Sequence, residues 1–134
     1  SIDLQGLMVS DDGGGETWLI DEALDLEAGG FAVMARDTAA TTAYDLIWSG
    51  FQLVNTEDEV ILSTYGTDGT DGTVIHSVYY DDTDWPDLAG ASLSLDPDAF
   101  DTTSGADPAN WCAGQSVYDT GDLGTPGADN DDCP

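Results

Sequence analysis

Short segments rich in β-branched and aromatic residues alternate along this chain with turns rich in Gly, Asp and Thr. This spacing is typical of an all-β sandwich or barrel, in which each short strand reverses direction to pack against its neighbours. The pattern predicts little helix. Strands are expected at residues 4–9, 17–20, 31–36, 60–65 and 74–80, with weaker ones near 46–48, 92–95 and 116–118.

Two stretches refine this expectation. The two Asp-Gly steps within residues 66–72 predict a turn that joins strands 60–65 and 74–80 as an antiparallel hairpin. Residues 19–26 allow a helical alternative, in which Leu19, Ala23 and Leu26 line one face. Gly29 and Gly30 end that stretch, and the apolar run at 31–35 favours a central strand, so the all-β interpretation is preferred.

The length of 134 residues corresponds to one domain, residues 1–134. Hydrophobic residues make up 40% and aromatic residues 9%, which is enough to build a core. After Asp96 the composition shifts to Asp, Thr, Gly, Pro and Ala, so loops should dominate the C-terminal third. Trp111 is the expected anchor of these loops, because its ring buries a large apolar area and its N–H can bond to the backbone.

Cys112 and Cys133 are the only cysteines, and neither belongs to a C-x-x-C pair. A disulfide between them is the simplest interpretation, and two separate buried thiols are the alternative. An oxidised pair implies an extracellular or cell-surface location.

The charge balance restricts the partners of the chain. There are 28 acidic residues against a single basic one, Arg36, for a formal net charge of −27. Binding to nucleic acid or to anionic lipid requires clusters of Lys and Arg, so we expect neither as a partner unless metal ions bridge the contact. The longest apolar run, residues 31–35, is far too short for membrane insertion.

The clustered carboxylates favour cations, in one of two ways. A halophilic surface would hold hydrated ions diffusely, and the near-absence of basic residues along the whole chain favours that explanation. Alternatively, oxygen ligands in Asp-rich loops would bind calcium at discrete sites. The candidate ligands are Asp68, Asp71, Asp81, Asp82, Asp84, Asp129, Asp131 and Asp132.

Side chains suited to catalysis are scarce. His76 is the only histidine and lies in the middle of a predicted strand without a Ser or Cys partner in any motif, so we expect a packed or rim residue and no enzyme. Trp85, Tyr79 and Tyr80 lie next to an acidic loop and form a candidate contact patch for a surface polysaccharide, although core packing also explains them.

Six segments, taken in order, resemble the lamin-tail domain, an immunoglobulin-like β-sandwich found in nuclear lamins and in secreted prokaryotic proteins. The matching segments are residues 3–11 (DLQGLMVSD), 26–34 (LEAGGFAVM), 55–62 (NTEDEVIL), 90–93 (GASL), 107–111 (DPANW) and 124–130 (GTPGADN). The resemblance implies an immunoglobulin-like β-sandwich over nearly the whole chain. The two strands that usually open this family have no counterpart ahead of Asp3, so either the chain is trimmed or a neighbouring molecule supplies them by strand addition.

Together these features predict a non-catalytic extracellular structural or adhesive module that self-assembles into oligomers or filaments by β-strand addition. The first alternative is a calcium-dependent module that binds polysaccharide. The second is an accessory domain of a secreted hydrolase, which follows only from the resemblance.

Overall fold

The structure is a computed structural model that describes residues 1–11, 16–36, 42–50, 52–65 and 71–134. It is all-β: antiparallel pairing predominates, and the helical segments are short 3-10 turns. The predicted fold class is therefore confirmed. The prediction for the 66–70 part of the hairpin turn lies outside the described residues.

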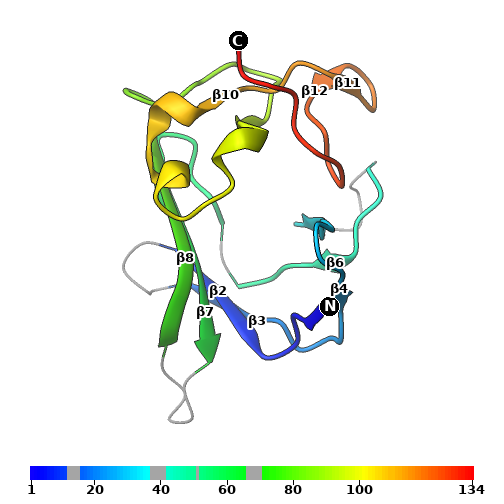
Figure 1. The fold of residues 1–134 in the computed structure, drawn as a ribbon. Coiled ribbons are helices and arrows are strands. Elements are labelled where there is room, and N and C mark those ends of the chain that lie inside the picture. Colours follow the sequence, from blue (N-terminus) through cyan, green and yellow to red (C-terminus); the bar gives the residue numbers. More distant parts are fainter. Residues whose placement is uncertain (12–15, 37–41, 51, 66–70) are drawn as a thin grey trace.

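The largest sheet has four antiparallel strands in the order β3-β2-β7-β8 (Figure 1). These strands are β2 (Leu7–Ser10), β3 (Thr17–Leu19), β7 (Glu57–Tyr65) and β8 (Asp71–Asp81). Val60 pairs with Val78 at the middle of the β7–β8 hairpin, and the register shifts near Ser63. The predicted hairpin pairing is thus confirmed, and both strands extend beyond the predicted limits.

The main core lies on one face of this sheet. Its buried members are Leu4, Val9, Trp18, Ile20 and Leu46, and Val60 and Leu62 of β7 pack against them. The opposite side of the core comes from two small sheets. One pairs β1 (Ile2–Asp3) with β4 (Asp25–Leu26), and the other pairs β5 (Met34–Ala35) with β6 (Leu46–Ile47) in parallel.

Two expectations for this half of the chain are settled by the structure. Residues 19–26 contain no helix, so the all-β interpretation holds there. The central strand expected at 31–36 is wrong, because only Met34–Ala35 is a strand and it belongs to a two-stranded sheet. The N–H of Val33 donates to the Asp45 carboxylate at 2.7 Å, so a side chain takes the place of a sheet partner.

Short elements form the C-terminal third, which Figure 1 places at the end of the molecule opposite β2 and β3. β9 (Leu93–Leu95) pairs with β10 (Trp111–Ala113), and β11 (Val117–Tyr118) pairs with β12 (Asp122–Leu123). The 3-10 turns η2 (Pro97–Ala99), η3 (Ser104–Ala106) and η4 (Pro108–Asn110) connect β9 to β10. The predicted loop-rich character of this region is confirmed.

The predicted anchors hold this region in place. The indole N–H of Trp111 donates to the Gly105 carbonyl at 2.9 Å. Cys112 and Cys133 form the predicted disulfide, with their Cα atoms 5.7 Å apart. The closing turn places Gly127 at a φ of 79°, which glycine adopts without strain, and the Asn130 side chain donates to the Leu95 carbonyl at 2.8 Å.

Aspartate carboxylates bind backbone N–H groups in turns and between segments. Asp101 Oδ1 accepts from the N–H groups of Thr103 and Ser104, and its second oxygen accepts from the Ser104 hydroxyl. Hydrogen bonds from Ser104 lower the pKa of Asp101. Other aspartate carboxylates that accept backbone N–H groups belong to Asp3, Asp11, Asp45, Asp58, Asp81, Asp96, Asp107 and Asp131.

We expect Ile20→Ala to lower the free energy of unfolding by about 2–5 kcal/mol, because it leaves a cavity in the core. Ile20 is 1% exposed, whereas Ile2 is 56% exposed. Ile2→Ala is therefore the matched control and should change stability by less than about 0.5 kcal/mol. Urea unfolding of both variants checks this, and equal effects would contradict the assigned core.

We expect replacement of both Cys112 and Cys133 by Ser to cost about 3 kcal/mol, because the bond closes a loop with a sequence separation of 21 residues. Thermal unfolding with and without a reductant measures the effect. The reduced native chain should unfold like the double variant. Unfolding that is insensitive to the reductant would show that the bond does not form.

Candidate functional site

A cavity of about 730 Å³ lies between the β7–β8 hairpin and the β9–β10 pair. Val60 and Val78 line it from the hairpin, and Leu93 and Trp111 line it from the facing pair. Its remaining walls come from the C-terminal end of β8 and from the segments on either side of the hairpin. They are Leu53, Asn55, Tyr80, Asp81, Asp82, Trp85, Pro86, Asp87, Leu88, Ala89 and Ala91.

Two tryptophans form one aromatic wall of this cavity. The ring centroids of Trp85 and Trp111 are 5.3 Å apart and their planes are tilted by 58°, an arrangement typical of favourable aromatic pairs. Trp85 is only 8% exposed. The bond from the Trp111 indole to the Gly105 carbonyl fixes the orientation of the second ring. Both rings are therefore held in place by the fold.

Tyr80 supplies a third aromatic side chain. Its hydroxyl donates to the Val54 carbonyl at 2.7 Å. The nearby Asp58 carboxylate is buried and accepts the N–H groups of Val54 and Glu59. Burial, and secondarily the negative charge of Asp58, raise the pKa of Tyr80 above its usual 10.0. The phenol therefore stays neutral at ordinary pH and ties β8 to the segment before β7.

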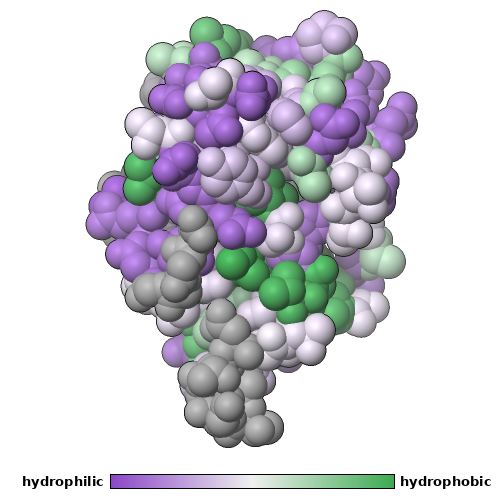
Figure 2. All heavy atoms as spheres, turned by 90° about the vertical axis from the view of Figure 1, so that its left-hand side faces the viewer, coloured by the Kyte–Doolittle hydropathy of each residue, from purple (hydrophilic) through white to green (hydrophobic). Residues whose placement is uncertain are grey.

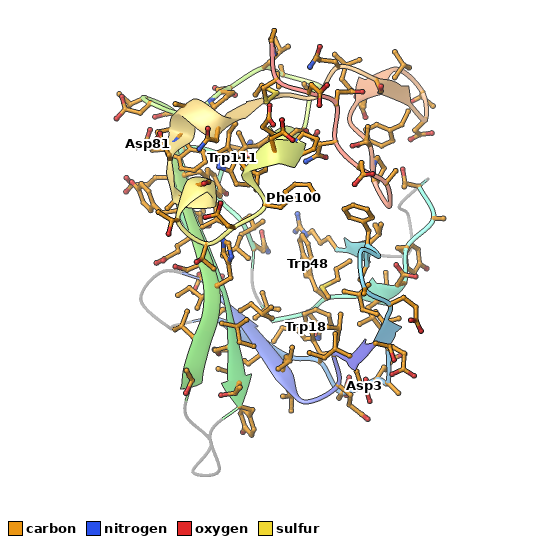
Figure 3. All side chains as sticks on the ribbon, in the orientation of Figure 1. Asp3, Trp18, Trp48, Asp81, Phe100 and Trp111 are labelled. Atoms are coloured by element: carbon orange, nitrogen blue, oxygen red, sulfur yellow. A yellow bond between two sulfur atoms is a disulfide. The ribbon has the colours of Figure 1, made fainter. Side chains whose placement is uncertain are left out.

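Carboxylates line part of the cavity near the end of β8. Figure 3 shows Asp81 and Trp111 close together there. Asp81 Oδ1 accepts the N–H groups of Thr83 and Asp84 at 2.8 and 2.7 Å, which shapes the turn that leads to Trp85. Asp82 and Asp87 also line the cavity and are exposed. The site thus combines aromatic faces with negative charge.

The three residues of the predicted aromatic patch, Trp85, Tyr79 and Tyr80, do not all lie together in the structure. Trp85 and Tyr80 both line the cavity, but Tyr79 does not. Neighbouring residues of a strand point to opposite faces, so Tyr79 and Tyr80 are separated by the sheet itself. The Tyr79 hydroxyl donates instead to Glu57 at 3.3 Å. Trp111 was expected only as a loop anchor, and its place beside Trp85 had no signal in the local sequence.

The predicted metal ligands are not brought together in the described part of the chain. No group of three or more His, Cys, Asp or Glu side chains there has the arrangement needed to hold a metal ion. Asp71 and Asp81 begin and end the 11-residue strand β8. The Asp131 carboxylate accepts from the Ser116 N–H and hydroxyl, which pins the tail.

The remaining candidate metal ligands have separate positions. Asp82 lines the cavity, whereas Asp84 is an exposed residue of the turn. Asp129 and Asp132 are exposed in the tail, and the Asp132 carbonyl accepts from the Gln115 side chain. Asp68 lies outside the described residues, as does the side chain of Asp71.

The imidazole of His76 lies against η3, because a side chain at Gly105 would meet two ring atoms at 3.6 Å. His76 is half-buried there, which agrees with the packed or rim position expected from the sequence. None of the described helical segments is long and apolar enough to cross a membrane.

A second candidate surface is the outer edge of β8, which we call the β8 edge. β8 is 11 residues long and ends the four-stranded sheet, so β7 is its hydrogen-bonded neighbour among the described strands. Three of its large hydrophobic side chains are exposed: Val74 by 54%, Ile75 by 46% and Tyr79 by 43%. Long, apolar edge strands favour pairing with another chain.

No family model matches the chain, and no curated protein or solved structure matches it. The resemblance to the lamin-tail domain therefore stays a prediction.

We expect one phenol of the native protein to ionise above the usual range, and Tyr80→Phe to remove that step. The raised pKa means that Tyr80 stabilises the fold fully below pH 10.0 and that this stabilisation is lost as the pH rises through the pKa of the folded state. Ultraviolet titration of tyrosinate measures this. Tyr65→Phe, which removes the hydroxyl of an exposed tyrosine, is the control and should keep the late step; its loss in the control would contradict the assignment.

Proposed function

We propose that this chain is a non-catalytic structural or adhesive module outside the cell or at its surface, and that copies associate by β-strand addition at the β8 edge. The observation that carries the proposal is that the longest strand lies at the end of its sheet. An added strand would satisfy backbone groups along the edge, as it does in other complexes formed by strand addition.

The side chains along this edge support the proposal. Figure 2 looks at the side of the molecule on which β8 lies, and hydrophobic residues gather in the lower half of that face among hydrophilic ones. Between Asp71 and Asp81, residues 72–80 contain no acidic residue, although the chain has 28 in all. A second copy could therefore approach along β8 without placing carboxylates of the two edges directly opposite one another.

The net charge of −27 opposes association, and salt weakens this opposition. The screening length falls from about 10 Å at 0.1 M salt to about 3 Å at 1 M. Contacts between strands are short-range, whereas repulsion between whole molecules acts over longer distances. Association should therefore strengthen with salt, in keeping with a halophilic surface.

The disulfide and the packed histidine also support this role. Cys112–Cys133 anchors a loop-rich region in the way common among secreted domains. His76 lies against the backbone of η3 at Gly105, which gives it a packing role.

We expect the native protein to form oligomers at about 1 M NaCl and to be mostly monomeric at about 0.1 M. Val74→Lys should raise the Kd for self-association at least about tenfold, because a lysine on an edge strand disfavours pairing. Val117→Lys is the matched control, since Val117 is 70% exposed on β11 and the charge change is the same. Light scattering and sedimentation measure the oligomeric state.

Hydrogen exchange gives a second readout. Within residues 72–80, the amides that point away from β7 should become protected when the protein associates, and this protection should be absent in Val74→Lys. A native protein that stays monomeric at every salt concentration would contradict the proposal, as would equal effects of the two lysine substitutions.

A further inference from the structure

The cavity beside Trp85 and Trp111 has the size of a small-molecule site. Its volume of about 730 Å³ lies within the range of about 300–1,000 Å³ that such sites occupy. Its walls are largely apolar and aromatic, and the few polar side chains are carboxylates and one Asn. This composition restricts which ligand the cavity can hold.

All charged side chains of the lining are carboxylates, and its hydrogen-bond donors come from Asn55 and from the aromatic residues Tyr80, Trp85 and Trp111. The Tyr80 hydroxyl already donates to Val54, and the Trp111 indole already donates to Gly105. The carboxylates of Asp82 and Asp87 can only accept when ionised. A quaternary ammonium ion has no N–H group, so carboxylates attract its positive charge without a hydrogen bond. The negative charge of the lining therefore favours a cationic ligand over a neutral one.

The aromatic faces of the cavity and the overall charge of the chain also favour a cationic ligand. A cation over the face of Trp or Tyr is attracted by the negative face of the ring. The net charge of −27 raises the local concentration of cations around the molecule. Arg36 is the only Lys or Arg in the sequence, and it lines a different cleft with Glu16 and Trp48. The chain therefore has no Lys or Arg of its own to place in this cavity.

A bare metal ion fits the cavity poorly. Calcium takes six to eight oxygen ligands, but the described residues contain no group of three potential ligands arranged for a metal ion. A cation that carries its own hydrocarbon surface would instead contact Trp85, Trp111 and Val78 while its charge faces Asp82 and Asp87. We propose that this cavity binds a small organic ammonium ion, such as an alkylated amine.

Isothermal titration with choline chloride tests the proposal on the intact protein, at about 1 M NaCl to screen the diffuse ion atmosphere. We expect stoichiometric binding. The neutral carbon isostere 3,3-dimethylbutan-1-ol has nearly the same shape and should bind at least about tenfold more weakly. Equal binding of the isostere, or no heat with choline, would overturn the proposal. A neutral oligosaccharide that saturates the cavity where choline does not would also overturn it.

Two double variants with the same loss of charge locate the site. Asp82→Asn with Asp87→Asn should weaken choline binding at least about tenfold, because both carboxylates line the cavity. Asp21→Asn with Glu22→Gln removes two exposed charges elsewhere and should leave binding within about twofold of native. Equal losses in both would indicate a diffuse cation atmosphere and overturn the site.

The proposed site is independent of the β8 edge. Val74→Lys should bind choline as the native protein does, whether or not the native protein self-associates. Near-ultraviolet circular dichroism checks that each variant keeps its aromatic packing. Loss of choline binding in Val74→Lys with intact packing would contradict a separate site.

Discussion

The hydrogen bond from a backbone N–H to an aspartate carboxylate is the interaction on which much of this structure depends. With 28 acids and one basic residue, carboxylates have almost no cationic side chain to pair with. Many bind the backbone instead, and such charge-assisted bonds are stronger than neutral ones. The clearest case is Asp58, which is buried and holds the N–H groups of Val54 and Glu59. The acidic residues therefore fix turns in addition to forming a hydrated surface.

The β7–β8 hairpin connects the two apolar regions of the molecule. Val60 packs against the main core and also lines the cavity, and Val78 pairs with it across the hairpin. The outer side of β8 is the edge proposed for association. One hairpin therefore supports the core, the candidate ligand site and the candidate interface. A substitution in the middle of β7 would affect all three, whereas Val74 and Asp82 allow the interface and the cavity to be tested separately.

Local patterns predicted the parts of the fold that depend on local physics. The period-two alternation and the Asp-Gly steps predicted the hairpin, because both reflect the geometry of neighbouring residues. The prediction of a strand at residues 31–36 was wrong because a residue distant in sequence decides the hydrogen bonding there. The apolar run of this segment favours a strand, but Asp45 takes the Val33 N–H, so only Met34–Ala35 enters a sheet. The pairing of β9 with β10 was also missed, since three 3-10 turns separate the two strands.

The sequence alone predicted the all-β class and the cysteine pairing, which the structure confirms, and its charge balance predicts that polyanionic partners do not bind. Alternation, cysteine count and charge balance are enough for these conclusions, because each is a property of composition or of near neighbours. Only the tertiary structure placed Trp111 beside Trp85 and showed that the cavity lies on the face of β8 that carries Tyr80. Only the fold showed that Asp131 binds Ser116. These contacts join segments that are distant along the chain or depend on which face of a sheet is covered, and no local pattern encodes either.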